Sequence, residues 1–407
     1  MRVEVWNIMR KRIALCLITL CLVLAGCGKN ENPAENMGAA SDCDAQNKYR
    51  GTVSGVFVFQ ETEELFLGSS FLGQSVCYYD KASGIRGVLC ADPSCTHDSS
   101  ECGASITEGG FFYAGEGKAY WLQQGELRDG WDYFLYKGDL SGNGRELVKR
   151  ISMEDVIQEY NPQWYEIHRD RLYVLGQKDI VEGVNTYTRV TLVSTPLEGS
   201  DNYTLLFDET FDRAVHPYVR FVGDDIYLTM QIFTPDSPVD VKILRIGTKT
   251  GEHETVYEET GRMEAIRPAW VTQDAEIYLP GYCDGHACVW KLENGQRVEV
   301  FSWEYGSRTC PDIMDGIAVF TYSEEGIRWI DVIDLSGQLL YSGKLFPEAI
   351  PGIEGDPNTC SRTVIGGDPD KLIMNLQSIT QNGIVDYTVM LDLKDNLKAT
   401  VLWSSQD

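Results

Sequence analysis

The chain carries four short runs between residues 109 and 151, namely FFYAG (111–115), KAYWLQ (118–123), DYFLYKGDL (132–140) and RELVKRI (145–151). Each run is rich in aromatic and branched residues, and glycine-containing or polar turns separate one run from the next. This pattern predicts four successive antiparallel strands that form one small twisted sheet. Because such a sheet buries little apolar surface by itself, a long chain of such units must pack its sheets against one another, and radial repetition is the usual arrangement.

The last two runs of this unit form a hairpin pattern that recurs along the chain. Each copy has an apolar strand, an acidic or polar turn, usually with glycine, and a second strand. The copies begin at Val76, Leu135, Val193, Leu244, Val289, Ile330 and Val389. The sequence therefore predicts an all-β chain in which residues 51–407 form a seven-bladed β-propeller. Closure of the ring removes the exposed sheet edges that otherwise promote aggregation.

The composition is that of a folded, acidic protein. Of 407 residues 43% are hydrophobic and 24% are charged, which gives ample material for a core. There are 61 Asp and Glu against 35 Lys and Arg, for a formal net charge of -26. Since this charge repels phosphate backbones and anionic lipid headgroups, we expect no nucleic acid among the partners.

The amino-terminus has the pattern of an export signal. Arg10, Lys11 and Arg12 precede an apolar run over residues 13–24 that is too short to span a bilayer but has the length of a signal peptide's apolar region. The following Leu24-Ala25-Gly26-Cys27 resembles the bacterial lipobox, which implies removal of residues 1–26 and acylation of Cys27. An ordinary signal peptide that leaves Cys27 as a free thiol is the alternative.

The next segment, residues 27–50, is polar and without periodicity, and is predicted to be a flexible tether behind the acylated Cys27. Acyl chains contribute about 0.8 kcal/mol per buried methylene, so two long chains anchor a protein stably. We therefore expect a lipid-anchored protein on the extracytoplasmic face of the cell membrane, with the lipid as its only membrane contact.

Three features together carry a family resemblance: the lipobox, the YYDKASG hairpin from Tyr78, and the segment LCADPSCTHDSSEC from Leu89 to Cys102. With these the chain resembles propeller lipoproteins of Gram-positive gut anaerobes. The resemblance covers the anchor and the first blade distinctly and the later blades only in architecture. It implies the anchor and the fold, and it brings no activity with it.

Cysteines gather in the first blade, where Cys90, Cys95, His97 and Cys102 fall within thirteen residues. Thiolates and imidazole are the ligands of structural zinc, but this spacing is irregular for such a site and exported proteins meet oxidising conditions. Disulfides are the preferred interpretation, with no metal and no cofactor, and a metal site and free thiols are the alternatives. The alternation of side chains along a hairpin predicts a Cys77–Cys90 pair and leaves Cys95 to pair with Cys102.

The same alternation applies to the hairpin around Asp284-Gly285, a dipeptide typical of a tight turn. It places Cys283 and Cys288 on one face and predicts a second, short cross-strand disulfide. His286 makes a metal site conceivable there, but two thiols and one imidazole leave a zinc ion incompletely ligated.

Several blades are predicted to open with a residue followed by proline and an apolar strand. Proline donates no backbone hydrogen bond and suits the start of a strand. In a propeller the innermost strand begins at the mouth of the central channel, where ligands commonly bind. We therefore expect the pre-proline residues Asn161, His216 and Arg267 to form a ring around that mouth, with Cys360-Ser361 in the matching place of the seventh blade.

The simpler alternative is that these polar residues only hydrogen-bond loop carbonyls. The functional interpretation is a binding site for an anionic ligand such as an acidic sugar or a peptide carboxylate, because a guanidinium matches a carboxylate in two parallel hydrogen bonds. No catalytic motif stands out from the sequence. A propeller that binds a small molecule, glycan or protein partner at its channel face is the leading hypothesis, and a polysaccharide lyase or hydrolase and a structural envelope scaffold are the alternatives.

Overall fold

A computed structural model of the protein describes residues 59–406, except 70–74, 98, 100–101, 107–110, 116–117, 125–131, 141–143, 153–160, 183–184, 200–201, 235–236, 263–268, 284–285, 304–310, 354–355 and 382. All of these residues belong to one compact unit, Cys43–Asp407. The predicted signal peptide 1–26, the predicted acylation site Cys27 and the tether 27–50 lie outside the described residues.

The described structure consists of seven antiparallel sheets, and each sheet contains four consecutive strands. The first three blades contain β1 (Phe59–Glu61), β2 (Leu65–Ser69), β3 (Val76–Asp80) and β4 (Arg86–Val88); β5 (Phe111–Gly115), β6 (Lys118–Gln124), β7 (Asp132–Asp139) and β8 (Glu146–Ser152); β9 (Asn161–His168), β10 (Arg171–Glu182), β11 (Asn185–Pro196) and β12 (Thr204–Phe211).

The remaining four blades follow the same order. They contain β13 (Ala214–Val222), β14 (Asp225–Thr234), β15 (Ser237–Gly247) and β16 (His253–Arg262); β17 (Trp270–Val271), β18 (Ile277–Cys283), β19 (His286–Glu293) and β20 (Gln296–Trp303); β21 (Asp312–Met314), β22 (Ile317–Glu324), β23 (Ile327–Asp334) and β24 (Leu339–Lys344); β25 (Ser361–Asp368), β26 (Lys371–Thr380), β27 (Gly383–Asp392) and β28 (Lys398–Ser404). A short 3-10 helix, η1 (Pro357–Thr359), precedes β25.

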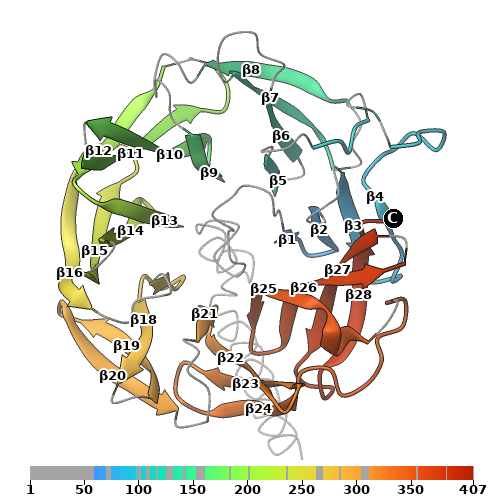
Figure 1. Ribbon diagram of the computed structural model, residues 1–407. Coiled ribbons are helices and arrows are strands. Elements are labelled where there is room, and N and C mark those ends of the chain that lie inside the picture. The colour runs from blue at the N-terminus through green and yellow to red at the C-terminus, as the bar shows by residue number, and fades with distance from the viewer. Residues whose placement is uncertain are drawn as a thin grey trace, which may run out of the picture. The chain divides into compact units, whose positions relative to one another are not determined.

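The sheets lie around a ring, with the first strand of a blade, such as β5, β9, β13 or β25, nearest the centre in Figure 1. Strands β5 to β8 coincide with the four runs from which the fold was predicted, and the seven recurring hairpins coincide with the third and fourth strands of the seven blades. The predicted all-β, seven-bladed propeller is therefore confirmed.

One irregularity repeats from blade to blade. The pairing of the third with the fourth strand shifts register in each of blades two to seven, for example between Leu135 and Tyr136 and between Thr388 and Val389. Such a β-bulge adds one residue to a strand and increases its twist. The irregularity thus lies between the same two strands in six of the seven blades.

Neighbouring blades pack through alternate apolar side chains of their strands. In β13 the alternation buries Val215, Pro217, Val219 and Phe221. The Phe221 ring stacks on Trp164 of blade three at 5.9 Å between centroids, and its centroid is 4.6 Å from that of Tyr173. Burial of each such side chain is worth about 1.5–3 kcal/mol, so the interfaces between blades form the core of the ring.

The ring closes by contacts between side chains of blades one and seven, because each described sheet keeps its own four consecutive strands. Phe59 of β1 stacks on the fully buried Trp403 of β28, with ring centroids 5.6 Å apart. Arg86 Nη1 of β4 donates to the carbonyl oxygen of Val401 at 3.2 Å. These contacts join the first and the seventh blade, and within the described residues no strand is exchanged between the two sheets.

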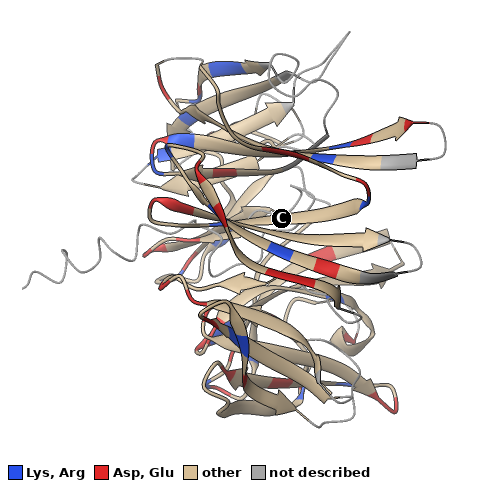
Figure 2. Cartoon of the chain, turned by 90° about the vertical axis from the view of Figure 1, so that its left-hand side faces the viewer, with Lys and Arg blue, Asp and Glu red and all other residues tan. Residues whose placement is uncertain are grey.

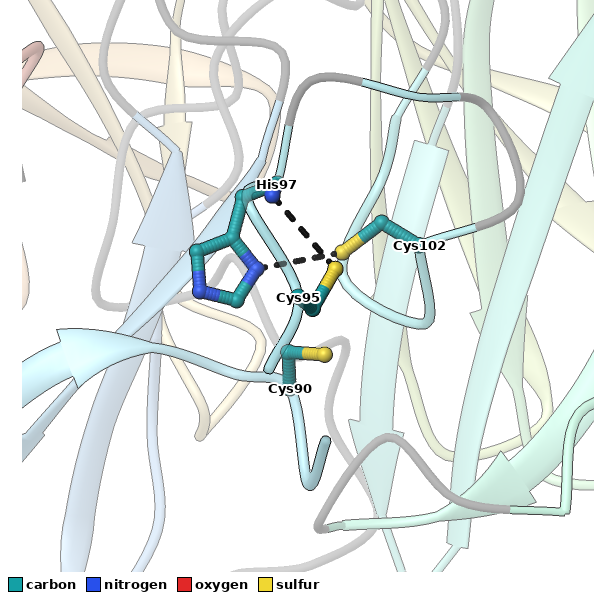
Figure 3. Close-up of side chains that lie close together, drawn as sticks. All are labelled: Cys90, Cys95, His97 and Cys102. Atoms are coloured by element: carbon teal, nitrogen blue, oxygen red, sulfur yellow. Dashed lines mark hydrogen bonds between the residues drawn. The ribbon is translucent and has the colours of Figure 1, made fainter. Parts of the chain in front are cut away.

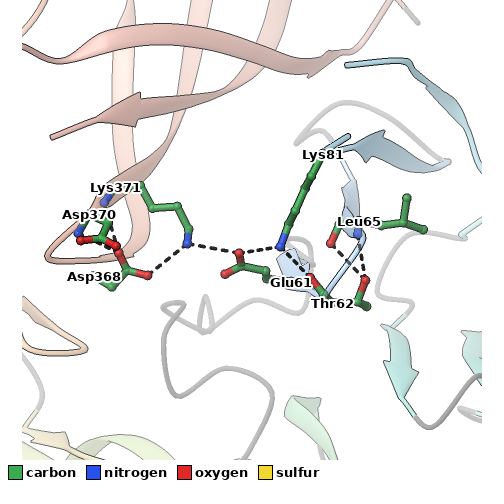
Figure 4. Close-up of polar contacts among 7 residues, drawn as sticks. All are labelled: Glu61, Thr62, Leu65, Lys81, Asp368, Asp370 and Lys371. Carbon is green, nitrogen blue, oxygen red and sulfur yellow. Dashed lines mark hydrogen bonds and ion pairs between the residues drawn. The ribbon is translucent and has the colours of Figure 1, made fainter. Parts of the chain in front are cut away.

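A charged network bridges the same junction (Figure 4). Glu61 Oε1 lies 2.7 Å from Lys81 Nζ in blade one and 3.1 Å from Lys371 Nζ in blade seven. Lys371 Nζ also lies 3.1 Å from Asp368 Oδ2. Burial lowers the pKa of Lys371, but the attraction of Glu61 and Asp368 outweighs burial and raises that pKa above its ordinary value.

We use the term channel face for the end of the ring at which the first strand of each blade begins. Because strands alternate in direction within a blade, the hairpins between second and third strands and the connections from one blade to the next lie at this same face.

Charged residues are concentrated in the turns of the propeller. At the left-hand edge of Figure 2 many turns carry charged residues, whereas most of each strand is neither basic nor acidic. Among the described residues no helix is long and apolar enough to cross a membrane.

Candidate ligand pocket at the channel face

A pocket of about 370 Å³ opens between blades six and seven. It is lined by Asp312, Thr321, Arg328, Ser361, Arg362, Thr363 and Val364. Asp312 is the first residue of β21 and Ser361 is the first residue of β25, so the pocket lies at the channel face. Thr321 and Arg328 come from β22 and β23, next to the hairpin that ends at the same face.

Local backbone structure explains these positions. The β22–β23 hairpin turns at Glu325 and Gly326, both with positive φ, and pairs Arg328 with Ser323. On β25 the side chain of Val364 is buried in the core shared with blade six, whereas Ser361 and Thr363 are exposed and Arg362 is half-buried. The start of an innermost strand thereby presents two hydroxyls and one guanidinium to the pocket.

Two guanidinium groups dominate the charge of the pocket. In the part of the chain that the structure describes, neither Arg328 nor Arg362 forms an ion pair, and Arg362 Nε is buried with no hydrogen-bond partner. Burial raises the pKa of the neighbouring Cys360 thiol, and the hydrogen bond with Ser378 and the positive charge of Arg328 partly offset this rise. With Asp312 as the one carboxylate of the lining, the pocket carries a local positive charge on a strongly acidic chain.

Such an arrangement is suited to holding an anion. A guanidinium offers a planar set of N–H donors that matches a carboxylate or phosphate in two parallel hydrogen bonds. The hydroxyls of Thr321, Ser361 and Thr363 can each donate or accept one more hydrogen bond. The buried, unpartnered Nε of Arg362 is a donor that a bound ligand would satisfy.

The predicted ring residues lie elsewhere on the channel face or outside the described residues. Asn161 is the first residue of β9, opposite Gln177. His216 is exposed on β13, with its ring centroid 4.7 Å from that of Phe233. Arg267 falls in the segment 263–268, outside the described residues.

One detail of the ring prediction is wrong. Strand β13 begins at Ala214, so His216 and Pro217 lie inside the strand and do not mark its start. An innermost strand has one unpaired edge, which is why it can accommodate proline, a residue with no backbone N–H. Proline therefore marks an innermost strand of this protein without marking its first residue.

The pocket residues were not found by sequence reasoning, with one near exception. The sequence pattern predicts Cys360-Ser361 at the position in blade seven that matches the pre-proline residues of other blades, and Ser361 lines the pocket. No sequence motif marks the two arginines as binding residues. Arg328 comes shortly after a hairpin turn and Arg362 comes after a serine, and arginines in such positions are common on protein surfaces.

Among the described side chains, neither the predicted Cys77–Cys90 nor the predicted Cys95–Cys102 disulfide is formed. Cys77, Cys90, Cys95, Cys102 and Cys288 all carry free thiols. Strand β4 ends at Val88, and the N–H of Cys90 donates to the Val88 carbonyl at 2.8 Å in a three-residue turn. This turn takes Cys90 to the core shared with blade two, whereas Cys77 packs on Trp403 in the core shared with blade seven, so the predicted Cys77–Cys90 pair is wrong.

The predicted Cys283–Cys288 disulfide stays a prediction, because the side chain of Cys283 lies outside the described residues. Cys283 pairs with His286, and Cys288 pairs with Gly281. In the backbone register the two residues are thus diagonal neighbours.

Three of the described cysteines, Cys90, Cys95 and Cys102, lie together with His97, and these four side chains could hold a metal. Burial raises the pKa of the Cys102 thiol to about 11, so this thiol is protonated at neutral pH when no positive charge is bound to it. A nucleophilic role for Cys102 is therefore disfavoured.

A scan against protein-family models finds no match, and a sequence search of curated proteins finds no match. Among solved structures, the chain is similar to TolB from Acinetobacter baumannii, with 10% identity and a TM-score of 0.35 over 68% of this chain and 61% of that one. It is similar to an acylaminoacyl peptidase from Pyrococcus horikoshii, with 13% identity and a TM-score of 0.47 over 83% of this chain and 52% of that one. It is also similar to the β-propeller domain of the Trilobed protease from Pyrococcus furiosus, with 13% identity and a TM-score of 0.42 over 86% and 94%.

The chain thus spans less than two thirds of the length of TolB and of the peptidase. With TM-scores below 0.5, these similarities assign neither a family nor an activity to this chain.

Proposed function

We propose that this chain is a lipid-anchored, extracytoplasmic propeller lipoprotein that binds a small anionic ligand at its channel face, in the pocket between blades six and seven. The observation that carries the proposal is the pair Arg328 and Arg362, two guanidinium groups in one pocket with no ion-pair partner among the described residues. In a chain of formal net charge -26, two neighbouring basic groups that form no ion pair within the described residues are the feature that needs a function. The anchor is supported by the sequence around Cys27.

The ligand class follows from the lining. Two guanidinium groups bind a carboxylate or a phosphate, and the three hydroxyls suit a ligand that also carries hydroxyl groups, such as an acidic sugar. A volume of about 370 Å³ lies at the small end of the range for ligand sites, which favours a molecule of one or two sugar rings over a long polymer.

A thermal-shift screen of the purified protein against acidic sugars, small dicarboxylates, sugar phosphates and their neutral analogues tests the proposal. A ligand present at a hundred times its Kd stabilises the folded protein by about 2.7 kcal/mol, which such a screen detects. We expect acidic compounds to raise Tm, their neutral analogues to have no effect, and the stabilisation to weaken as salt is added.

Variants then locate the site. Arg328→Gln and Arg362→Gln should each weaken binding by about tenfold to a hundredfold, because each removes a charged hydrogen-bond donor worth about 1.5–3 kcal/mol. Arg245→Gln is the matched control, since Arg245 lies in blade four and pairs with Glu254 on an exposed surface. Unchanged affinity in the double variant Arg328→Gln/Arg362→Gln would refute the pocket.

The two alternative functions are outcomes of the same experiment. Cleavage of a polysaccharide by the purified protein would favour the lyase or hydrolase. If no compound binds and the protein is stabilised only by a partner protein from the envelope, the scaffold is the better interpretation.

A further inference from the structure

The connection between β4 and β5 gathers four potential metal ligands at one point (Figure 3). The sulfurs of Cys90, Cys95 and Cys102 and a ring nitrogen of His97 all lie within 4.8 Å of one another. His97 Nδ1 is 3.4 Å from Cys102 Sγ, and the backbone N–H of His97 donates to Cys95 Sγ at 3.4 Å. Cys102 is buried and the other three residues are half-buried.

These distances match the edges of a tetrahedral zinc site. With zinc–sulfur bonds of about 2.3 Å and a zinc–nitrogen bond of about 2.0 Å, neighbouring ligand atoms lie about 3.5–3.8 Å apart. The 3.4 Å between His97 Nδ1 and Cys102 Sγ already has the length of such an edge. Every other pair of ligand atoms reaches that length if the atoms move by less than about 1 Å. We propose that Cys90, Cys95, His97 and Cys102 bind one structural Zn²⁺ ion.

The backbone holds the ligands in place through tight turns. The N–H of Cys95 donates to the Asp92 carbonyl at 3.2 Å, and the N–H of Cys102 donates to the Ser99 carbonyl at 3.1 Å. His97 has a φ of 59°, in the left-handed region that a non-glycine residue enters at an energetic disadvantage. This conformation brings the N–H of His97 to one sulfur and its ring to another, which is what the proposed site requires.

A buried cation beside the cluster supplies a second, independent observation. Arg145 Nη1 donates to the carbonyl oxygens of Cys102 and Ser105 at 3.3 and 3.4 Å, and its guanidinium lies 5.1 Å from the ring centroid of Trp121. Its Nε and Nη2 are buried without a hydrogen-bond partner. Three thiolates and one Zn²⁺ carry a net charge of minus one, so Arg145 is placed to balance the loaded site, as groups around metal ligands commonly do.

A disulfide accounts for the cluster less well. One bond between two of the three sulfurs leaves the third thiol and His97 unused, and Cys77 lies in the core on the other side of blade one. A Cys₃His set uses all four side chains, and thiolate with imidazole selects zinc over oxygen-binding cations. Since all four positions of the tetrahedron come from the protein, the ion has a structural role, and it holds the irregular connection between blades one and two.

The test uses the full chain purified from membranes in detergent, without chelator. We expect one zinc per chain by elemental analysis and, after exchange with Co²⁺, the visible and near-ultraviolet absorption bands of tetrahedral cobalt–thiolate coordination. Cys95→Ser and His97→Ala should each lose the metal on dialysis, whereas Cys360→Ser, which changes a free buried thiol in blade seven, should keep it.

Two results would overturn the proposal. One is a metal-free protein in which thiol titration under denaturing conditions shows two of the three cluster cysteines oxidised. The other is full zinc occupancy in both His97→Ala and Cys95→Ser. If Cys95→Ser fails to fold, His97→Ala decides alone, because His97 lies on an irregular segment and is half-buried.

Discussion

Glutamine in place of Glu61 should weaken the junction that closes the propeller. The Glu61 carboxylate is the anion between Lys81 of blade one and Lys371 of blade seven (Figure 4). The substitution keeps the size of the side chain and one acceptor oxygen but leaves two ammonium groups facing each other without the charge that separates them. We therefore expect lower stability with an unchanged fold.

The magnitude follows from distance and burial. At an effective dielectric constant of about 20, unit charges 2.7 and 3.1 Å apart attract by about 6 and 5 kcal/mol before the desolvation of the groups is subtracted. Breaking a fully buried pair costs about 3–5 kcal/mol and an exposed pair about 0–1 kcal/mol. The side chains of Glu61, Lys371 and Lys81 are only 16%, 19% and 27% exposed, so the loss should lie nearer the buried limit, at about 2–3 kcal/mol.

Thermal unfolding followed by circular dichroism measures this effect. For a chain of this length a loss of that size lowers Tm by about 2–4 °C. Asp370→Asn is the matched control in blade seven, because Asp370 pairs with Lys394 at 2.6 Å while both side chains are more than 60% exposed, at 63% and 71%. The control should change stability by less than about 0.5 kcal/mol. Equal Tm values for Glu61→Gln and Asp370→Asn would refute the assignment of ring closure to the buried network.

Three further predictions concern other parts of the chain. Trp403→Ala should lower the free energy of unfolding in denaturant by about 3–5 kcal/mol, because it leaves a cavity beside Phe59 at the junction of blades one and seven; a loss below about 1 kcal/mol would contradict this packing. Asp208→Asn should reduce the loss of stability in acid. Hydrogen bonds from Arg189 hold the pKa of Asp208 below its ordinary 3.8. The stability that these bonds contribute is therefore fully present above pH 3.8 and is lost as pH falls through the lowered pKa. Identical dependence of unfolding free energy on pH in wild type and variant between about pH 5 and 3 would contradict this prediction. Cys27→Ser should move the protein from the membrane to the soluble fraction on centrifugation, and its recovery with the membranes at the wild-type level would argue against the lipid anchor.

The sequence by itself determined the architecture of this protein, because that information is local. Each of the runs 111–115, 118–123, 132–140 and 145–151 contains its own strand signal, and the turn between two runs sets their antiparallel pairing. The hairpin recurs seven times, so an error in one copy would not have changed the inferred blade count by more than one. Ring closure implies that blades one and seven meet, but neither the stacking of Phe59 on Trp403 nor the charged network at Glu61 could be predicted, since no pattern links residues so far apart in the sequence.

Tertiary structure decided the sites, because each depends on which neighbouring segments meet. The pocket needs Arg328 from the β22–β23 hairpin and Arg362 from the start of the next blade, and only the packing of blade six on blade seven brings the two together. The cysteines show the same dependence at short range. Alternation along an ideal hairpin placed Cys90 beside Cys77, but one turn after Val88 directs Cys90 to the opposite side of the sheet, where it meets Cys95, His97 and Cys102. Side-chain alternation holds only while the strand continues, and where a strand ends is set by the packing of the whole blade.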